Sequence, residues 1–225
     1  MEFLTVLDEL VRIDTDVFLF FNQMHCPYFD YFMSAFSGKL VWIPLYASLL
    51  YLLFKNFNWK VTLMSVIGIA LLIVITDQSV SSLIRPEVCR LRPSNLDNPI
   101  SDLVHIVNGR RGGSYGFPSC HASNTFGLAF FLMFLFRNRK LTAFFLTWAV
   151  FTCYSRIYLG VHYPGDTLAG MLVGLVAAAL VYGVMRRFCG LPRKEHIDQA
   201  YVPIAVGGLT VVCFFIYSGI MLWVM

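Results

Sequence analysis

Long apolar segments alternate with short polar connections along this chain. Six segments are apolar enough to form membrane-crossing helices, and they cover residues 40–54, 61–84, 119–136, 141–154, 163–185 and 201–225. A helix needs about 20 apolar residues to cross a bilayer. The first segment is shorter, but Lys39 and Lys55 flank it, and such side chains can reach water from within the apolar layer. The pattern predicts an all-α fold, a polytopic membrane helical bundle with about six transmembrane helices.

The first segment of the chain, residues 1–37, is apolar but repeatedly interrupted by polar side chains such as Asp14 and Asn22. That is too polar for an ordinary membrane-crossing helix. We expect two short amphipathic helices at the membrane interface, broken near Cys26 and Pro27, with a distorted spanning helix as the alternative.

No internal repeat or linker divides the chain. We therefore expect a single membrane-embedded domain over residues 1–225. It would comprise the N-terminal amphipathic segment 1–37, a polar loop at 85–118 and a C-terminal transmembrane helix at 201–225.

The composition agrees with a membrane protein. Hydrophobic residues make up 58% of the chain and charged residues only 13%, whereas a soluble domain carries about 25% charged residues. The net charge of +4 does not suggest nucleic acid as a partner. The six cysteines include no CxxC pair, so we expect neither a zinc site nor a disulfide framework.

Basic residues are divided almost evenly between the two ends of the predicted bundle, so their total does not orient it. The short connections at 55–60, 137–140 and 186–194 are the better guide, because short cytoplasmic connections are enriched in Lys and Arg. We expect these turns in the cytoplasm, and the polar loop on the periplasmic or exterior side of a bacterial inner or plasma membrane.

Three polar clusters lie at the ends of predicted helices, at residues 85–93, 116–121 and 154–166. Counting the crossings places all three on the same face of the membrane. Charged groups near a membrane are costly and mark functional sites. Their common position predicts one composite site.

The side chains in these clusters suit a phosphate group. Arg85, Arg92 and Arg156 carry planar guanidinium groups that match phosphate oxygens. Pro118-Ser119 is typical of a helix start with Ser119 as its N-cap, which leaves backbone N–H groups free to bind an anion.

Two histidines in the clusters are candidates for bond-making chemistry. Of His121 and His162, one can attack phosphorus and the other can protonate the leaving oxygen. Asp166 follows His162 at helical spacing, so its carboxylate can accept from one imidazole nitrogen and leave the other free. These residues alone do not decide which histidine attacks.

Together, the clusters resemble the three-part signature of the type 2 phosphatidic acid phosphatase (PAP2) superfamily, and the whole chain looks most like its bacterial integral-membrane lipid phosphatases. That signature reads Lys-x6-Arg-Pro, Pro-Ser-Gly-His and Ser-Arg-x5-His-x3-Asp. The matching segments are Arg85-x6-Arg92-Pro93, Pro118-Ser119-Cys120-His121 and Ser155-Arg156-x5-His162-x3-Asp166. Two positions depart from the family, because Arg85 replaces a lysine and Cys120 replaces a glycine.

The resemblance implies a role for each matching residue. His162 would be the nucleophile that forms a phosphohistidine, and Asp166 would orient it. His121 would protonate the leaving group and then activate water. The phosphate would be bound by Arg85, Arg92, Ser119, Cys120 and Arg156. The resemblance implies no metal and no cofactor.

We therefore expect an integral-membrane lipid phosphatase that hydrolyses the phosphomonoester or pyrophosphate of a membrane lipid. Undecaprenyl diphosphate and lipid A phosphate are favoured over phosphatidylglycerol phosphate and phosphatidate. A lipid phosphotransferase with the same site, and a phosphate-lipid binding or transport protein without turnover, are the alternatives. The expected partners are the substrate and the bilayer, with no obligate protein partner.

Four further polar residues are interpreted individually. His25 and His105 fit solvated loop positions, and Arg90 fits a contact to anionic lipid headgroups. For Asp77 we favour support of the site arginines over a structural hydrogen-bond partner within the bundle.

Overall fold

The computed structural model describes residues 2–224, with side-chain burial from residue 5 onward, and most of these residues are helical. The α-helices are α1 Glu2–Asn22, α2 Pro27–Phe36, α3 Ile43–Asn56, α4 Trp59–Gln78, α5 Arg85–Val88, α6 Cys120–Phe136, α7 Arg139–Tyr158, α8 Pro164–Cys189 and α9 Tyr201–Val224. Single 3-10 or π turns lie at η1 Leu40–Trp42, η2 Ser79–Ile84, η3 Ser101–Leu103 and η4 Val107–Gly109.

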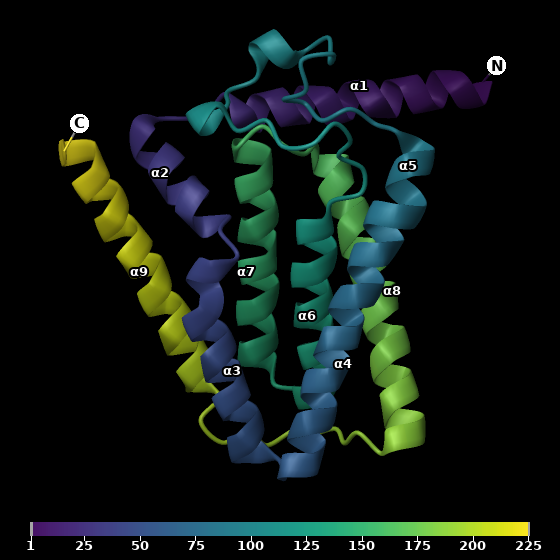
Figure 1. Cartoon of the computed structure of the whole chain (residues 1–225), viewed down its shortest axis with the longest axis vertical. Coiled ribbons are helices and arrows are strands. Elements are labelled where there is room, and N and C mark those ends of the chain that lie inside the picture. Colours follow the sequence, from purple (N-terminus) through teal and green to yellow (C-terminus); the bar gives the residue numbers. More distant parts are fainter. Residues whose placement is uncertain (1, 225) are drawn as a thin grey trace.

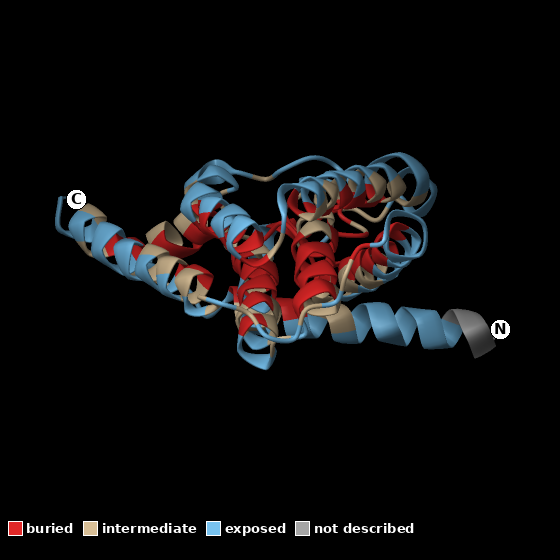
Figure 2. Cartoon of the chain, turned by 90° about the horizontal axis from the view of Figure 1, so that it is seen from below, coloured by how far each residue is buried: buried red, intermediate tan, exposed pale blue. Residues whose placement is uncertain are grey.

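Helices α3, α4, α6, α7 and α8 stand side by side as a bundle, and α9 leans against α2 and α3 on its outside (Figure 1). Helix α1 lies across one end of the bundle, next to the long connection between α5 and α6. Burial is concentrated between the upright helices, whereas most of α1 is exposed (Figure 2). The all-helical bundle expected from the sequence is confirmed.

Each predicted span coincides with one of the long helices, but the count of six membrane-crossing helices is not confirmed. By length and composition, the described residues contain three helices that can cross a membrane: Trp59–Val88, Pro164–Cys189 and Tyr201–Val224. A fourth is obtained if Pro27–Phe36 and Leu40–Asn56, which meet at a bend of 69°, count as one broken span. The chain is nevertheless an integral membrane protein by the apolar surface of these helices.

The N-terminal segment is broken near the position expected. Helix α1 ends at Asn22, and α2 begins with Pro27 at its first turn, a position where the missing proline N–H costs nothing. The apolar residues of α1 that remain exposed include Leu10 and Phe20, as expected for a helix at a membrane interface.

Helices α6 and α8 approach closely because α8 presents glycines at their contact. A Cβ on Gly174 would lie 2.5 Å from the carbonyl oxygen of Ser123 and 2.8 Å from the backbone nitrogen of Gly127. Small residues allow this approach in lipid, where packing rather than the hydrophobic effect holds helices together. The glycines of α8 therefore pack within the chain, and they set how closely α6 and α8 approach each other.

We predict that Gly174→Val destabilises the bundle, because backbone atoms of α6 occupy the space that the new side chain needs. Overpacking of this kind costs about 1–3 kcal/mol or more. The measurement is the thermal unfolding midpoint of the purified protein in detergent. Gly183→Val is the matched control, since a Cβ on Gly183 in the same helix meets nothing within 4 Å. Equal midpoints for the two variants would contradict the packing argument.

Candidate active site

The three polar clusters meet at one end of the bundle, and a short backbone pairing fixes the first of them. The amide of Arg92 donates to the carbonyl of Ser114 (3.0 Å), and the amide of Gly116 donates to the carbonyl of Arg90 (2.9 Å). Residues 90–92 therefore run antiparallel to 114–116, with a bridge between Leu91 and Tyr115. This pairing holds the arginines of the loop over the first turns of α6 and α8.

His162 and Asp166 form a buried pair. Nδ1 of His162 lies 3.2 Å from Oδ2 of Asp166, and the same oxygen accepts from the backbone N–H of Tyr163 at 3.0 Å. His162 is 2% exposed and Asp166 is not exposed at all. The site has no room for a side chain at Gly116, because a Cβ there would lie 2.9 Å from Oδ2 of Asp166.

A guanidinium group fixes the tautomer of His162. Nη1 of Arg92 lies 3.1 Å from Nε2 of His162 and donates to the carbonyl of Val161 at 3.0 Å. Because a guanidinium group can only donate, Nε2 is the acceptor and the imidazole proton is on Nδ1, facing Asp166. The lone pair of Nε2 therefore points toward the arginine.

The charges around His162 keep its imidazole neutral. Burial, followed by the positive charges of Arg92, Arg156 and Arg85, lowers the pKa of His162 well below its ordinary value. Burial and the neighbouring charge of Arg85 also lower the pKa of Arg92. A neutral imidazole is the form that can act as a nucleophile.

These three arginines have no carboxylate counter-ion among the residues that the structure describes. Among the described residues, none of Arg85, Arg92 and Arg156 forms an ion pair with a carboxylate. Their Nε atoms are buried and have no hydrogen-bond partner in that part of the chain. Cations with buried donor atoms are normally paired, so the arrangement suits an anion with several acceptor oxygens.

Helix α6 begins as the sequence predicts. The Ser119 hydroxyl accepts from the amide of Ala122 at 3.4 Å, and Ser119 is fully buried. The amide of Ser119 donates to the carbonyl of Asp166 at 2.9 Å, which ties the second cluster to the third.

The two departures from the family signature contact each other. Nη2 of Arg85 donates to the carbonyl of Pro118 at 3.0 Å and lies 3.4 Å from Sγ of Cys120. Cys120 is the first residue of α6 and is not among the residues with positive φ, so its side chain causes no backbone strain. The longer arginine and the thiol thus occupy adjoining positions beside the helix start.

Arg90 belongs to the site, and its interpretation as a lipid-headgroup contact is wrong. Its Nη1 lies 3.0 Å from Oδ1 of Asp166 and 2.7 Å from Oδ2 of Asp14, and its guanidinium carbon lies 3.9 Å from the centre of the Tyr163 ring. Asp14 also accepts from the amide of Gly165 at 2.7 Å. The charge of Arg90 is therefore used between two carboxylates. No sequence signal marks it, because it occupies an unspecified position of the signature and Asp14 lies far away in the chain.

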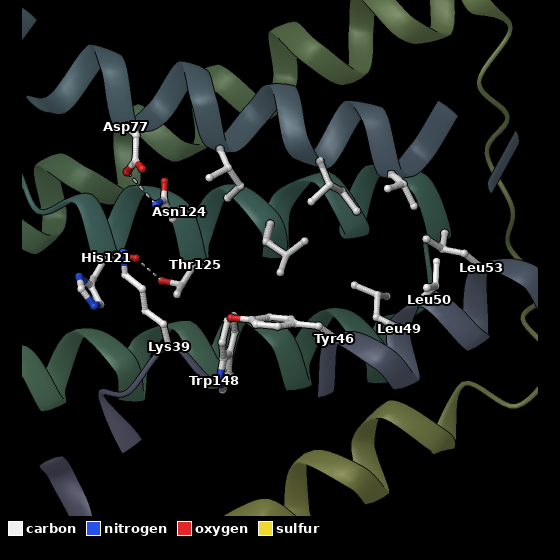
Figure 3. A pocket seen from close by; sticks show the side chains of 14 residues that line it. Lys39, Tyr46, Leu49, Leu50, Leu53, Asp77, His121, Asn124, Thr125 and Trp148 are labelled. Atoms are coloured by element: carbon white, nitrogen blue, oxygen red, sulfur yellow. Dashed lines mark hydrogen bonds between the residues drawn. The ribbon is translucent and has the colours of Figure 1, made fainter. Parts of the chain in front are cut away.

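Arg156 and His121 extend the site toward the interior of the bundle. Nη1 of Arg156 lies 2.5 Å from Oγ of Ser37, which follows α2. His121 lies at the polar end of a cavity of about 500 Å³ between α3, α4, α6 and α7. Lys39, expected only to flank a span, points toward the same end (Figure 3).

Two other interpretations are corrected. His105 is not a solvated loop residue, because its Nε2 lies 2.8 Å from Oδ1 of Asp30 and its ring stacks on the exposed His25 at 3.6 Å. Asp77 does not support the arginines. It accepts from Asn124 at 2.9 Å, so the alternative of a hydrogen-bond partner in the bundle is what the structure shows.

Three arginines without a carboxylate partner in the described part of the chain, around a neutral, oriented imidazole and with a second histidine nearby, are typical of a phosphatase site. Comparison with known proteins agrees. The family model described as "PAP2 superfamily" matches residues 63–188. The chain belongs to the PAP2 superfamily.

Two relatives match over most of their length. A lipid A 4'-phosphatase of Bacteroides thetaiotaomicron is 51% identical over 221 residues, covering 95% of this chain and 98% of the relative. A lipid A 4'-phosphatase of Porphyromonas gingivalis is 36% identical over 204 residues, covering 87% of this chain and 84% of the relative.

The fold also matches a solved structure. The crystal structure of Aquifex aeolicus LpxE superposes with a TM-score of 0.56 at 24% identity, over 75% of this chain and 94% of that one. At this identity the likeness supports the fold alone.

We predict that Arg90→Gln lowers kcat at least about tenfold and lowers the thermal unfolding midpoint. The change leaves the buried Asp166 without its cationic partner, and breaking such a pair is strongly destabilising. The measurement is phosphate release together with thermal unfolding in detergent. Arg110→Gln is the control, because Arg110 is exposed in the same loop. A variant with unchanged kcat would show that Arg90 does not hold Asp166 in its working position.

Proposed function

We propose that the chain hydrolyses a phosphomonoester of a membrane lipid through a phosphohistidine on His162. The observation that carries this proposal is the set of three arginines near His162, whose Nε atoms are buried without a hydrogen-bond partner and which have no carboxylate partner among the described residues. A phosphate monoester carries nearly two negative charges and three acceptor oxygens, so it satisfies those guanidinium groups.

In the first step, the phosphate binds to Arg85, Arg92 and Arg156 and to the N–H groups at the start of α6, which Ser119 caps and Cys120 opens. Before phosphate binds, Nε2 of His162 accepts a hydrogen bond from Arg92. Once phosphate is bound, Arg92 donates to phosphate oxygens instead, and Nε2 of His162 becomes free to attack. A P–N bond forms as the P–O bond to the lipid breaks.

The leaving oxygen needs a proton, and the water that follows must lose one. His121, at the end of the cavity, gives the proton to the lipid alcohol and then accepts a proton from the attacking water. Water releases inorganic phosphate and restores the neutral imidazole. Asp166 holds the Nδ1–H of His162 throughout, and Arg90 stabilises the charge of that carboxylate.

The cavity supports a lipid substrate over a soluble phosphate ester. The cavity is lined mostly by apolar side chains of α3, α4 and α6, including Leu49, Ile73 and Leu128. In Figure 3, the labelled leucines Leu49, Leu50 and Leu53 lie away from the polar end at His121. An acyl chain of a membrane lipid fits such a space. The relatives described as lipid A 4'-phosphatases make the 4'-phosphate of lipid A the favoured substrate, ahead of undecaprenyl diphosphate.

We predict that wild-type protein releases phosphate from lipid A in a panel that also holds undecaprenyl diphosphate, phosphatidylglycerol phosphate and phosphatidate. His162→Ala should lower turnover at least about a thousandfold, because removal of a nucleophile has effects of this size. Binding of vanadate should persist in that variant, since the arginines remain. The control is His196→Ala, because His196 is exposed in the connection between α8 and α9.

Undiminished turnover in His162→Ala would show that His162 is not the nucleophile. Wild-type protein that binds vanadate but releases phosphate from no lipid would be a binding protein and not a phosphatase. Diversion of the phosphoryl group to an added alcohol would favour the phosphotransferase.

We further propose that the site faces the periplasm or cell exterior. Two free, exposed cysteines report on this without substitution: Cys89 follows α5 at the site, and Cys189 ends α8 at the opposite end of the bundle. A membrane-impermeant maleimide on intact cells should label Cys89 and spare Cys189, as read by mass spectrometry of peptides. Permeabilised cells, in which both are labelled, are the control. The reverse pattern on intact cells would place the site in the cytoplasm.

A further inference from the structure

The cavity below His121 is not uniformly apolar. One face of α6 contributes His121, then Asn124 and Thr125, then Leu128, at helical spacing. Successive members lie one helical turn apart, a rise of about 5.4 Å. A group that leaves from His121 and extends into the cavity therefore meets polar atoms first and aliphatic atoms only a turn later.

Asn124 and Asp77 provide the polar atoms that lie one helical turn from His121. Nδ2 of Asn124 donates to Oδ1 of Asp77 at 2.9 Å, and the hydroxyl of Thr76 donates to Oδ1 of Asn124 at 2.5 Å. The amide orientation is thereby fixed by two partners. Figure 3 shows both side chains on the wall across from Lys39 and Tyr46.

The carboxylate of Asp77 can accept more hydrogen bonds than it receives from the described residues. Within the described chain, the bond from Asn124 is the one hydrogen bond that reaches it, whereas an ionised carboxylate can accept about four. A carboxylate only accepts, so it complements hydroxyl and amide N–H groups and is poorly matched to ester oxygens. A phosphate on the leaving group would also be repelled by it.

We propose that Asp77 and Asn124 form a leaving-group subsite, which selects phosphomonoesters whose alcohol carries hydroxyl or amide N–H donors near the ester oxygen. This inference rests on the proposed function. It favours amide-acylated sugar or amino-alcohol lipids over diacylglycerol phosphates, which offer only acceptors, and over prenyl diphosphates, which offer no donor. The acyl chain then occupies the aliphatic part of the cavity beside Leu128.

The test compares two simple two-chain phosphomonoesters of equal chain length. Ceramide 1-phosphate carries an amide N–H and a hydroxyl close to the ester oxygen, whereas phosphatidate carries two esters. Full-length wild-type protein in detergent should show the higher kcat/KM for ceramide 1-phosphate. Asp77→Asn should lower the ratio of the two kcat/KM values roughly tenfold or more, the worth of one hydrogen bond to a charged group.

The expected loss is selective. With an amide at position 77, its oxygen satisfies Asn124 and its NH₂ faces the cavity, where it suits the ester oxygens of phosphatidate. Turnover of phosphatidate should therefore stay within about twofold of wild type, by the small net worth of one neutral hydrogen bond. Asp16→Asn, on the exposed face of α1, is the matched carboxylate-to-amide control and should leave the ratio unchanged.

A second measurement needs no variant. Ceramide should inhibit the wild-type enzyme at lower concentration than diacylglycerol does, because it is the alcohol that the subsite retains. Three results would overturn the subsite: equal inhibition by ceramide and diacylglycerol, equal kcat/KM of the wild type for the two substrates, or an equal loss of both activities in Asp77→Asn. In each case, release of phosphate by the wild type would still support the proposed function. A wild type that releases phosphate from no lipid overturns both.

Discussion

The buried carboxylate of Asp166 is the group on which the site depends. Its two oxygens contact the imidazole of His162, the amide of Tyr163 and the guanidinium group of Arg90. The backbone carbonyl of Asp166 also accepts a hydrogen bond from the amide of Ser119. A single residue thus links the three polar clusters. Because a buried charge is costly unless it is paired and hydrogen-bonded, the positions of these partners are mutually constrained.

The parts of this arrangement that lie close together in sequence could be predicted. Helical spacing predicted the pair His162 and Asp166, and the sequence Pro118-Ser119 predicted the start of α6. The apolar segments predicted the bundle, because lipid demands that backbone groups be satisfied within each helix. Which helices can cross a membrane is harder to predict, since α7 carries basic residues at both ends and α3 continues from α2 through a bend.

Contacts between distant segments could not be predicted in the same way. Arg90 and Asp77 were both misinterpreted, and for the same physical reason. A lone charged residue near a membrane has several stable solutions: lipid headgroups, water or a partner in the protein. Sequence position does not distinguish these solutions, because the partners Asp14 and Asn124 come close only once the chain is folded.

Asp14 also makes α1 more than a surface attachment. This helix lies across the bundle with apolar side chains exposed, and yet it supplies the carboxylate that holds both Arg90 and the amide of Gly165. The hydrogen-bond network behind the imidazole is consequently completed by a residue of α1. A displacement of α1 therefore moves Asp14, and through Arg90 and Asp166 it moves the hydrogen bonds that orient the imidazole of His162.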